Sequence, residues 1–217
     1  MSPDQIKDQV AEFSKLLYDK GLVNAFEGNV SIKHNNQVYI TPNRIYKGSL
    51  TRDMIVVVDL NGNFEDDFYR PSSEVKIHLG AYKDRPDISA VIHTHSPYAT
   101  AYALANKPIE TKAYPEMITR FGIIPLAPYG NPSTDEVYEG VKPFLVQYDT
   151  VLLANHGIMA VGKDILDAFY KVEAAESIAK TFTFAALHGG EKVLPDNKLE
   201  ELYIKRAMLL GHIPNKA

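Results

Sequence analysis

The chain has 217 residues, of which 45% are hydrophobic and 23% are charged, a composition typical of a globular protein and not of a disordered or fibrous one. It contains no cysteine, which excludes a disulfide framework, a thiolate nucleophile, an iron–sulfur cluster and a cysteine zinc site. The net charge of −4, the absence of a long apolar window and an N-terminus unlike a signal peptide predict a cytoplasmic protein without nucleic-acid or membrane partners.

The first quarter of the chain predicts one helix followed by short strands. Ser2 and Gln5 form a capping box with Pro3 in the first turn, and the apolar stripe of this helix ends at Gly21. Short β-type runs separated by turn signals follow, at residues 29–32, 37–40 and 54–58. These runs indicate the strands of a meander.

The rest of the chain alternates helices with apolar strands. Five helices are expected: one that begins at residues 72–74 and ends near 84, one that follows Ser96, one that begins with a capping box at 133–136, one capped by Asp164, and one at 197–210. Apolar strands are expected at 88–95, 150–155 and 158–161, and Gly157 separates the last two. We find no repeat or linker, so the pattern predicts a single domain, residues 1–217, of the three-layer α/β or α+β class.

Three histidines stand at the ends of the two most apolar strands. His93 and His95 are two residues apart, so a strand places both on one face, and His156 follows the second strand directly before Gly157. An isolated His-x-His is more often a hydrogen-bonded pair inside a protein, but the matching positions favour a shared metal. Three imidazoles without cysteine suit Zn²⁺, ahead of Mn²⁺, Co²⁺ and Fe²⁺, and leave a coordination position open.

A pair of serines precedes Glu74 at the start of a predicted helix. Ser72 and Ser73, with the free N–H groups of the first turn, form an anion site suited to phosphate, or they only cap the helix. Glu74 either complements the helix dipole or, beside a metal, acts as fourth ligand or general base. His78 lies one helical turn further and could be its partner. Asn29 and Asn43 each lie in a small polar loop beside a strand. These two loops either bind the same anion or are ordinary turns.

The order of these motifs resembles the class II aldolase and adducin head family over about residues 21–182. The shared motifs are Gly28-Asn29-Val30-Ser31, Thr41-Pro42, Pro71-Ser72-Ser73-Glu74, His93-Thr94-His95, Ala127-Pro128-Tyr129 and Asn155-His156-Gly157. The resemblance implies a central, mostly antiparallel sheet with helices on both faces. It also implies a homotetramer with the active site at a subunit interface.

The resemblance also assigns roles to individual residues. It implies that one Zn²⁺ per subunit is held by His93, His95 and His156 together with Glu74, which is also the acid/base carboxylate. Tyr114 would match the tyrosine that protonates the aldehyde oxygen across the subunit interface. The substrate phosphate would be bound by Asn29, Asn43, Arg44, Ser72 and Ser73.

The reaction implied by the resemblance is the cleavage of a ketose 1-phosphate. L-Fuculose 1-phosphate, an intermediate of fucose catabolism, would give dihydroxyacetone phosphate and L-lactaldehyde. The alternatives are an L-ribulose-5-phosphate 4-epimerase, or a dehydratase or decarboxylase, on the same metal site. Glu74 favours the aldolase because the epimerases usually carry Asp there, and the full histidine set disfavours a non-catalytic adducin-like module.

Two departures from the family pattern affect the expected specificity. The aldolases usually have Thr or Ser and then Gly after Thr-Pro, whereas this chain has Asn43 and Arg44. Arg44 could bind phosphate through a bidentate contact, or could point away because the conformational freedom of glycine is lost. At the C-terminus, Leu209-Leu210-Gly211 stands near the place where the fuculose-phosphate enzymes carry a tail tyrosine.

Overall fold

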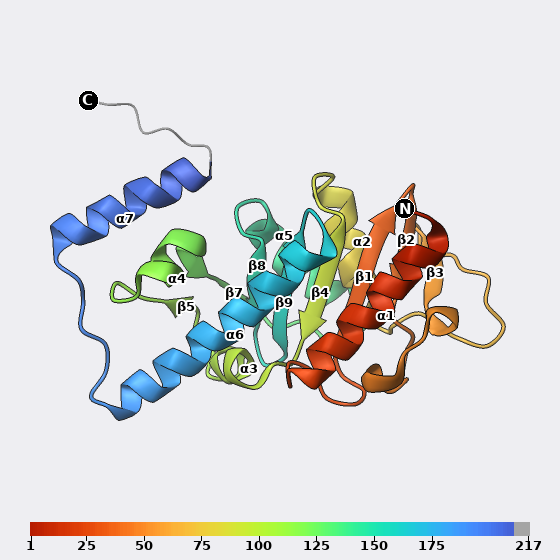
Figure 1. The fold of residues 1–217 in the computed structure, drawn as a ribbon, viewed down its shortest axis with the longest axis horizontal. Coiled ribbons are helices and arrows are strands. Elements are labelled where there is room, and N and C mark those ends of the chain that lie inside the picture. The colour runs from red at the N-terminus through yellow and green to blue at the C-terminus, as the bar shows by residue number, and fades with distance from the viewer. Residues whose placement is uncertain (211–217) are drawn as a thin grey trace.

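The computed structural model describes residues 1–210, so Gly211 and His212 lie outside the described part. Within that part, one sheet has the strand order β3-β2-β1-β4-β9-β8-β7 (Figure 1). Its strands are β1 (Asn29–His34), β2 (Gln37–Ile40), β3 (Val56–Asp59), β4 (Ala90–Thr94), β7 (Leu126–Ala127), β8 (Thr150–Leu153) and β9 (Gly157–Gly162). Every described neighbour pair is antiparallel except β7 and β8, so the expectation of a mostly antiparallel sheet is confirmed.

Helices cover both faces of this sheet, as expected for three layers. The helices are α1 (Pro3–Asp19) and α6 (Ile165–Leu187) on one face, and α2 (Val75–Asp84) and α5 (Asp135–Leu145) on the other. Successive residues of β4 point to opposite sides: Val91 packs with α2 and α5, and Ile92 packs with α1 and α6. The sheet is therefore buried on both faces, which explains the nearly continuous apolar runs of β4, β8 and β9.

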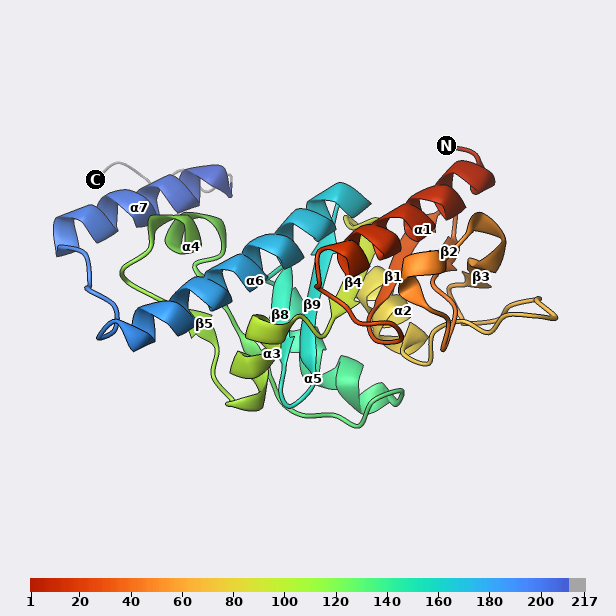
Figure 2. The same ribbon diagram turned by 60° about the horizontal axis from the view of Figure 1, so that its bottom comes forward.

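The remaining elements lie outside the seven-stranded sheet. They are η1 (Lys47–Ser49), η2 (Arg52–Met54), α3 (Pro97–Leu104), β5 (Ile109–Glu110) paired with β6 (Ile123–Ile124), α4 (Pro115–Arg120) and α7 (Asp196–Leu209). Of these, η1 and η2 pack against α1. In both views α7 lies beside α4 and away from the sheet (Figures 1 and 2). Leu199 is the buried residue of α7. In residues 1–210, no helix is both long and apolar enough to cross a membrane.

The structure confirms two helix caps and corrects two other local expectations. Ser2 and Asp164 cap α1 and α6 through their side chains. The cap of α5 is Thr134, whose hydroxyl accepts from the N–H of Glu136, so the capping box predicted to begin at Ser133 is wrong by one residue. Met54 belongs to η2, because the N–H of residue 54 turns back to a preceding carbonyl, and the strand expected from that residue begins at Val56.

Candidate active site

Two strands that run in the same direction, β4 and β8, bring the three histidines together. Both β4 and β8 pair antiparallel with β9, so their carboxyl ends lie at the same edge of the sheet. His93 lies in β4, His95 follows this strand, and His156 lies in the turn between β8 and β9. The three rings face one another, with centroids 4.7 to 4.9 Å apart.

Glu74, at the start of α2, completes the cluster. One potential ligand atom from each of the four residues lies within 4.8 Å of the others. Glu74 Oε2 is 3.3 Å from His93 Nε2, and Glu74 Oε1 is 3.1 Å from His156 Nε2. The Nε2 atoms of His93 and His95 are 3.0 Å apart. Four side chains from three separate segments of the sequence thus converge on one point.

Gly157 allows the rings to come this close. A Cβ atom there would lie 2.4 Å from the carbonyl oxygen of Thr94 and 2.8 Å from Cδ2 of His95. The left-handed backbone conformation in this turn is adopted by Asn155, with φ of +57°. Residue 157 is therefore restricted to glycine by the space beside the histidines, and the turn itself is made by Asn155.

The charges in the cluster are mutually dependent. Burial alone would raise the pKa of Glu74, but His93 and His156 outweigh it and hold this pKa well below its usual range. Burial alone would lower the pKa of His93, but Glu74 outweighs it and raises this pKa. Burial, with His93 and His156, lowers the pKa of His95 to about 4. Glu74 is therefore a carboxylate near pH 7, and it favours a cation among the rings.

The donor set fits a divalent metal ion. His93 Nδ1 lies 3.0 Å from the carbonyl oxygen of Ile158, so Nδ1–H donates to it and Nε2 faces the cluster. His95 Nε2 also faces this point, and two lone pairs 3.0 Å apart repel each other unless a cation or a proton lies between them. Three imidazoles and a carboxylate are a common ligand set for transition metals. These four residues could hold such an ion.

A buried hydrogen-bond chain extends behind Glu74. The side-chain amide of Asn29 donates to Glu74 Oε2 at 3.0 Å, and Asn29 Oδ1 is 2.5 Å from His78 Nε2. His78 Nδ1 is 2.7 Å from Ser31 Oγ, which is 2.8 Å from the Tyr82 hydroxyl. Burial lowers the pKa of His78 to about 3, so the ring is neutral and carries a single N–H. His78 therefore acts on Glu74 through Asn29.

Replacement of His78 tests this chain. His78→Phe leaves Asn29 Oδ1 buried without its His78 partner and leaves Ser31 Oγ with only Tyr82, so we expect it to lower the free energy of unfolding by about 1–3 kcal/mol. It should also lower turnover, because the Asn29 amide is then free to turn away from Glu74. Tyr82→Phe is the matched control, since it removes one hydroxyl at the far end of the chain and leaves the His78 contact to Asn29 in place. Equal losses of turnover in both variants would contradict a role of His78 in positioning.

A small cavity adjoins the cluster. It has a volume of about 60 Å³ and is lined by Phe26, Glu27, Gly28, Asn29, Pro42, Asn43, Arg44, Lys47, Ser72, Ser73 and Glu74. A β-bridge between Pro42 and Pro71 holds the two polar loops side by side. All five residues expected to bind phosphate therefore line one cavity that reaches the candidate metal ligand Glu74.

The two serines do not act as plain helix caps. The N-cap of α2 is Glu74, without a side-chain cap bond. Ser72 is buried and its Oγ accepts a long hydrogen bond of 3.3 Å from the N–H of Glu74, whereas Ser73 is exposed. Arg44 has φ of +55°, a left-handed conformation that costs a residue other than glycine about 1–2 kcal/mol. The exposed Arg44 thus adds a cation beside the cavity.

Comparison with known proteins agrees with this geometry. Residues 8–183 match the model of the family described as Class II Aldolase and Adducin N-terminal domain. The chain belongs to this family. A curated L-fuculose phosphate aldolase of Methanococcus maripaludis is 37% identical over 168 residues, which cover 76% of this chain and 89% of that protein. One of Escherichia coli O6:H1 is 34% identical over 196 residues, covering 90% and 89%.

Solved structures place the fold in the same family. A structure named L-fuculose 1-phosphate aldolase has a TM-score of 0.84 and 32% identity, and the match covers 93% of this chain and 95% of that one. YgbL from Escherichia coli has a TM-score of 0.82 at 22% identity and so shows the fold alone. The family and its aldolase relatives identify this chain as an enzyme of the aldolase class of lyases.

Of the site residues expected for this class II aldolase, Tyr114 lies apart from the metal cluster. Two residues at the site, Glu27 and Lys47, were not predicted from the sequence. Tyr114 precedes α4 and packs against Phe182 of α6, with ring centroids 6.2 Å apart. Glu27 Oε2 lies 3.3 Å from His95 Nδ1, and Lys47 is buried beside the same cavity. Neither belongs to a recognisable motif; only the positions of their loops place them at the site.

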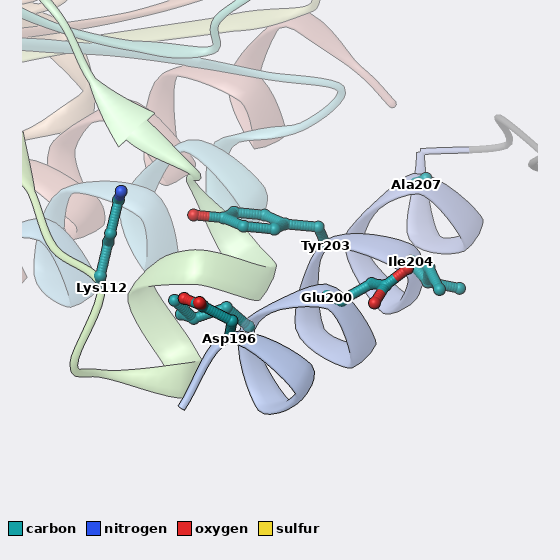
Figure 3. A pocket seen from close by; sticks show the side chains of 7 residues that line it. Lys112, Asp196, Glu200, Tyr203, Ile204 and Ala207 are labelled. Atoms are coloured by element: carbon teal, nitrogen blue, oxygen red, sulfur yellow. The ribbon is translucent and has the colours of Figure 1, made fainter. Parts of the chain in front are cut away.

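A larger hollow of the aldolase lies elsewhere, at α7. It has a volume of about 400 Å³, and Figure 3 shows Lys112, from the loop before α4, facing Asp196 and Tyr203 of α7. The residues that line it include no histidine. This hollow therefore has no part in the metal cluster.

Proposed function

We propose that this aldolase cleaves a ketose 1-phosphate, with L-fuculose 1-phosphate as the first candidate, into dihydroxyacetone phosphate and L-lactaldehyde. The observation that carries the proposal is the continuity of the Glu74–histidine cluster with the polar cavity lined by Ser72, Ser73 and Arg44. A phosphorylated ketose needs both an electrophilic centre and an adjacent anion site. The names of the relatives at 34–37% identity support the same substrate.

We propose Zn²⁺ as the metal, held by His93, His95, His156 and Glu74, because imidazole-rich sites without thiolates suit it. When bound there, such an ion would supply positive charge to offset the negative charge that develops as the C3–C4 bond breaks. The four side chains provide it with a partly buried site, in which electrostatic interactions are stronger than in water.

The proton transfers are assigned to Glu74 and Tyr114. In the synthetic direction, the Glu74 carboxylate removes a proton from the carbon of dihydroxyacetone phosphate that becomes C3, and the electrons of that C–H bond form the enediolate. This carbon attacks the aldehyde carbon to form the C3–C4 bond, and the Tyr114 hydroxyl donates its proton to the aldehyde oxygen, which becomes the C4 hydroxyl. Exchange with solvent then returns Glu74 to the carboxylate and Tyr114 to the phenol, and cleavage is the reverse of these steps. Asn29 holds Glu74 by its amide, and Asn43, Arg44, Ser72 and Ser73 bind the phosphate. Because Tyr114 packs away from the cluster in its own chain, we propose that it acts from a neighbouring subunit of a homotetramer.

A metal analysis followed by a product assay tests the proposal. The purified protein should contain about one divalent ion per chain and should release dihydroxyacetone phosphate fastest from L-fuculose 1-phosphate, when compared with L-rhamnulose 1-phosphate and L-ribulose 5-phosphate. Epimerisation of the last substrate without any release of dihydroxyacetone phosphate would replace the aldolase by the epimerase. Because cells form and retain phosphorylated sugars internally, we place the reaction in the cytoplasm, in fucose catabolism.

A further inference from the structure

Lys47 is a buried lysine in the wall of the anion cavity. It begins η1, is only 3% exposed, and lines the cavity together with Arg44 and Ser72. Its Nζ donates to the carbonyl oxygen of Ile45 at 3.2 Å. Within residues 1–210 it forms no ion pair with a carboxylate. Lysine is almost never this buried unless it is paired, so Lys47 needs an explanation.

The position of Lys47 is costly to the free protein. An ammonium group has three donors, and a single carbonyl leaves part of this capacity unused. Burial lowers the pKa of Lys47 to about 8, which shows that its charged form is disfavoured in this place. A buried charge without a partner destabilises the fold. Native proteins break such local rules mainly at functional sites.

The location of Lys47 suggests which partner is missing. Its backbone N–H donates to the carbonyl oxygen of Ala25 at 2.9 Å, which fixes η1 against the loop that leads to β1 and Asn29. The same cavity is lined by the carboxylates of Glu27 and Glu74, which repel an incoming anion. A dianion therefore requires compensating positive charge in the wall. Arg44 is exposed and screened by water, whereas the desolvated Lys47 interacts with a bound anion more strongly.

We propose that Lys47 is the buried cation that binds the substrate phosphate, and that it makes the enzyme select phosphorylated over free sugars. This assignment rests on the proposed function, since it names the residue that decides the substrate class at that site. In the complex, Lys47 donates to a phosphate oxygen, and the anion supplies the charge partner that the free protein lacks.

Titration of the full-length protein with inorganic phosphate tests the assignment by calorimetry. Lys47→Met keeps the length of the side chain and removes the charge, so we expect it to bind phosphate at least about 10-fold more weakly than the wild type. Lys76→Met, which removes an exposed lysine of α2 paired with Asp135, is the matched control and should bind phosphate as the wild type does. Lys47→Arg, which keeps the charge, should retain more affinity than Lys47→Met.

Thermal unfolding separates this role from a structural one. Without phosphate, Lys47→Met should melt at the same or a higher temperature than the wild type, because a buried charge is removed; it should lose the rise in melting temperature that phosphate gives the wild type. A structural lysine would instead give a lower melting temperature and an unchanged rise. Equal phosphate affinity of Lys47→Met and the wild type, or no phosphate binding by the wild type, would overturn the assignment.

Kinetics distinguish failure of this assignment from failure of the proposed function. Lys47→Met should lose kcat/KM for the ketose 1-phosphate and leave kcat/KM for the free ketose unchanged. If the wild type binds phosphate through Lys47 but cleaves none of the sugar phosphates, the proposed function is wrong and the assignment of Lys47 stands. A covalent adduct on Lys47 after borohydride reduction with dihydroxyacetone phosphate would overturn the assignment, because it would make Lys47 a Schiff-base nucleophile.

Discussion

Glu74→Gln should lower the turnover number by about 10²- to 10⁴-fold, the usual contribution of a general acid–base group. Glutamine keeps the size of the side chain, and its amide oxygen can still accept from the Asn29 amide. The substitution therefore removes the proton carrier with little change in packing. Steady-state rates measured together with the metal content of the same preparation provide the test, because a loss of metal alone would also lower the rate.

The matched control for Glu74→Gln is the same substitution at a glutamate outside the site. Glu12→Gln changes an exposed residue of α1 and should leave the rate and the metal content at wild-type values. Because His93 and His156 hold the pKa of Glu74 low, the wild-type carboxylate stays ionised through neutral pH. The turnover number of Glu74→Gln should therefore be lower than that of the wild type throughout the neutral pH range. Near-normal turnover of Glu74→Gln with metal still bound would show that another group moves the proton.

His95→Ala should release the metal ion and abolish the activity that depends on it. Loss of an outer partner of a metal ligand typically costs 10- to 100-fold in affinity, so loss of a ligand should cost at least about 100-fold. His95 is the suitable site because its side chain is 22% exposed, whereas that of His93 is fully buried and holds Ile158. Competition with a coloured chelator measures the affinity, and circular dichroism checks the fold.

The pH dependence of metal binding gives a second test of the same cluster. Since Glu74 raises the pKa of His93, a proton on this ring competes with the metal as the pH falls. The affinity should therefore increase as the pH rises through the pKa of His93 and then level off. His34→Ala, at the end of β1 and outside the cluster, should reproduce the wild-type curve. A pH-independent affinity would exclude proton competition at His93, and a His95→Ala protein that binds metal normally would exclude His95 as a ligand.

The sequence by itself determined the helix caps, the apolar strands and which histidines are candidate metal ligands. The Ser2 and Asp164 caps and the apolar runs of β4, β8 and β9 follow from short-range patterns, and the structure agrees with them. The histidines could be selected because each one interrupts or ends an apolar strand, and strand periodicity alone puts His93 and His95 on one face. Each of these features depends only on residues that are close together in the sequence, so it can be predicted without the tertiary structure.

Only the tertiary structure decided how these residues act together. Asn29 and Glu74 are 45 positions apart, and the Ser31–His78 contact spans 47, so no local pattern shows that the Asn29 amide faces the carboxylate or that His78 orients it. Lys47 is typical of a surface residue by sequence, and only the packing of η1 buries it at the cavity. The physical reason is that burial and charge pairing depend on which loops the antiparallel sheet brings to one edge, and strand pairing across tens of residues is not encoded in any single segment.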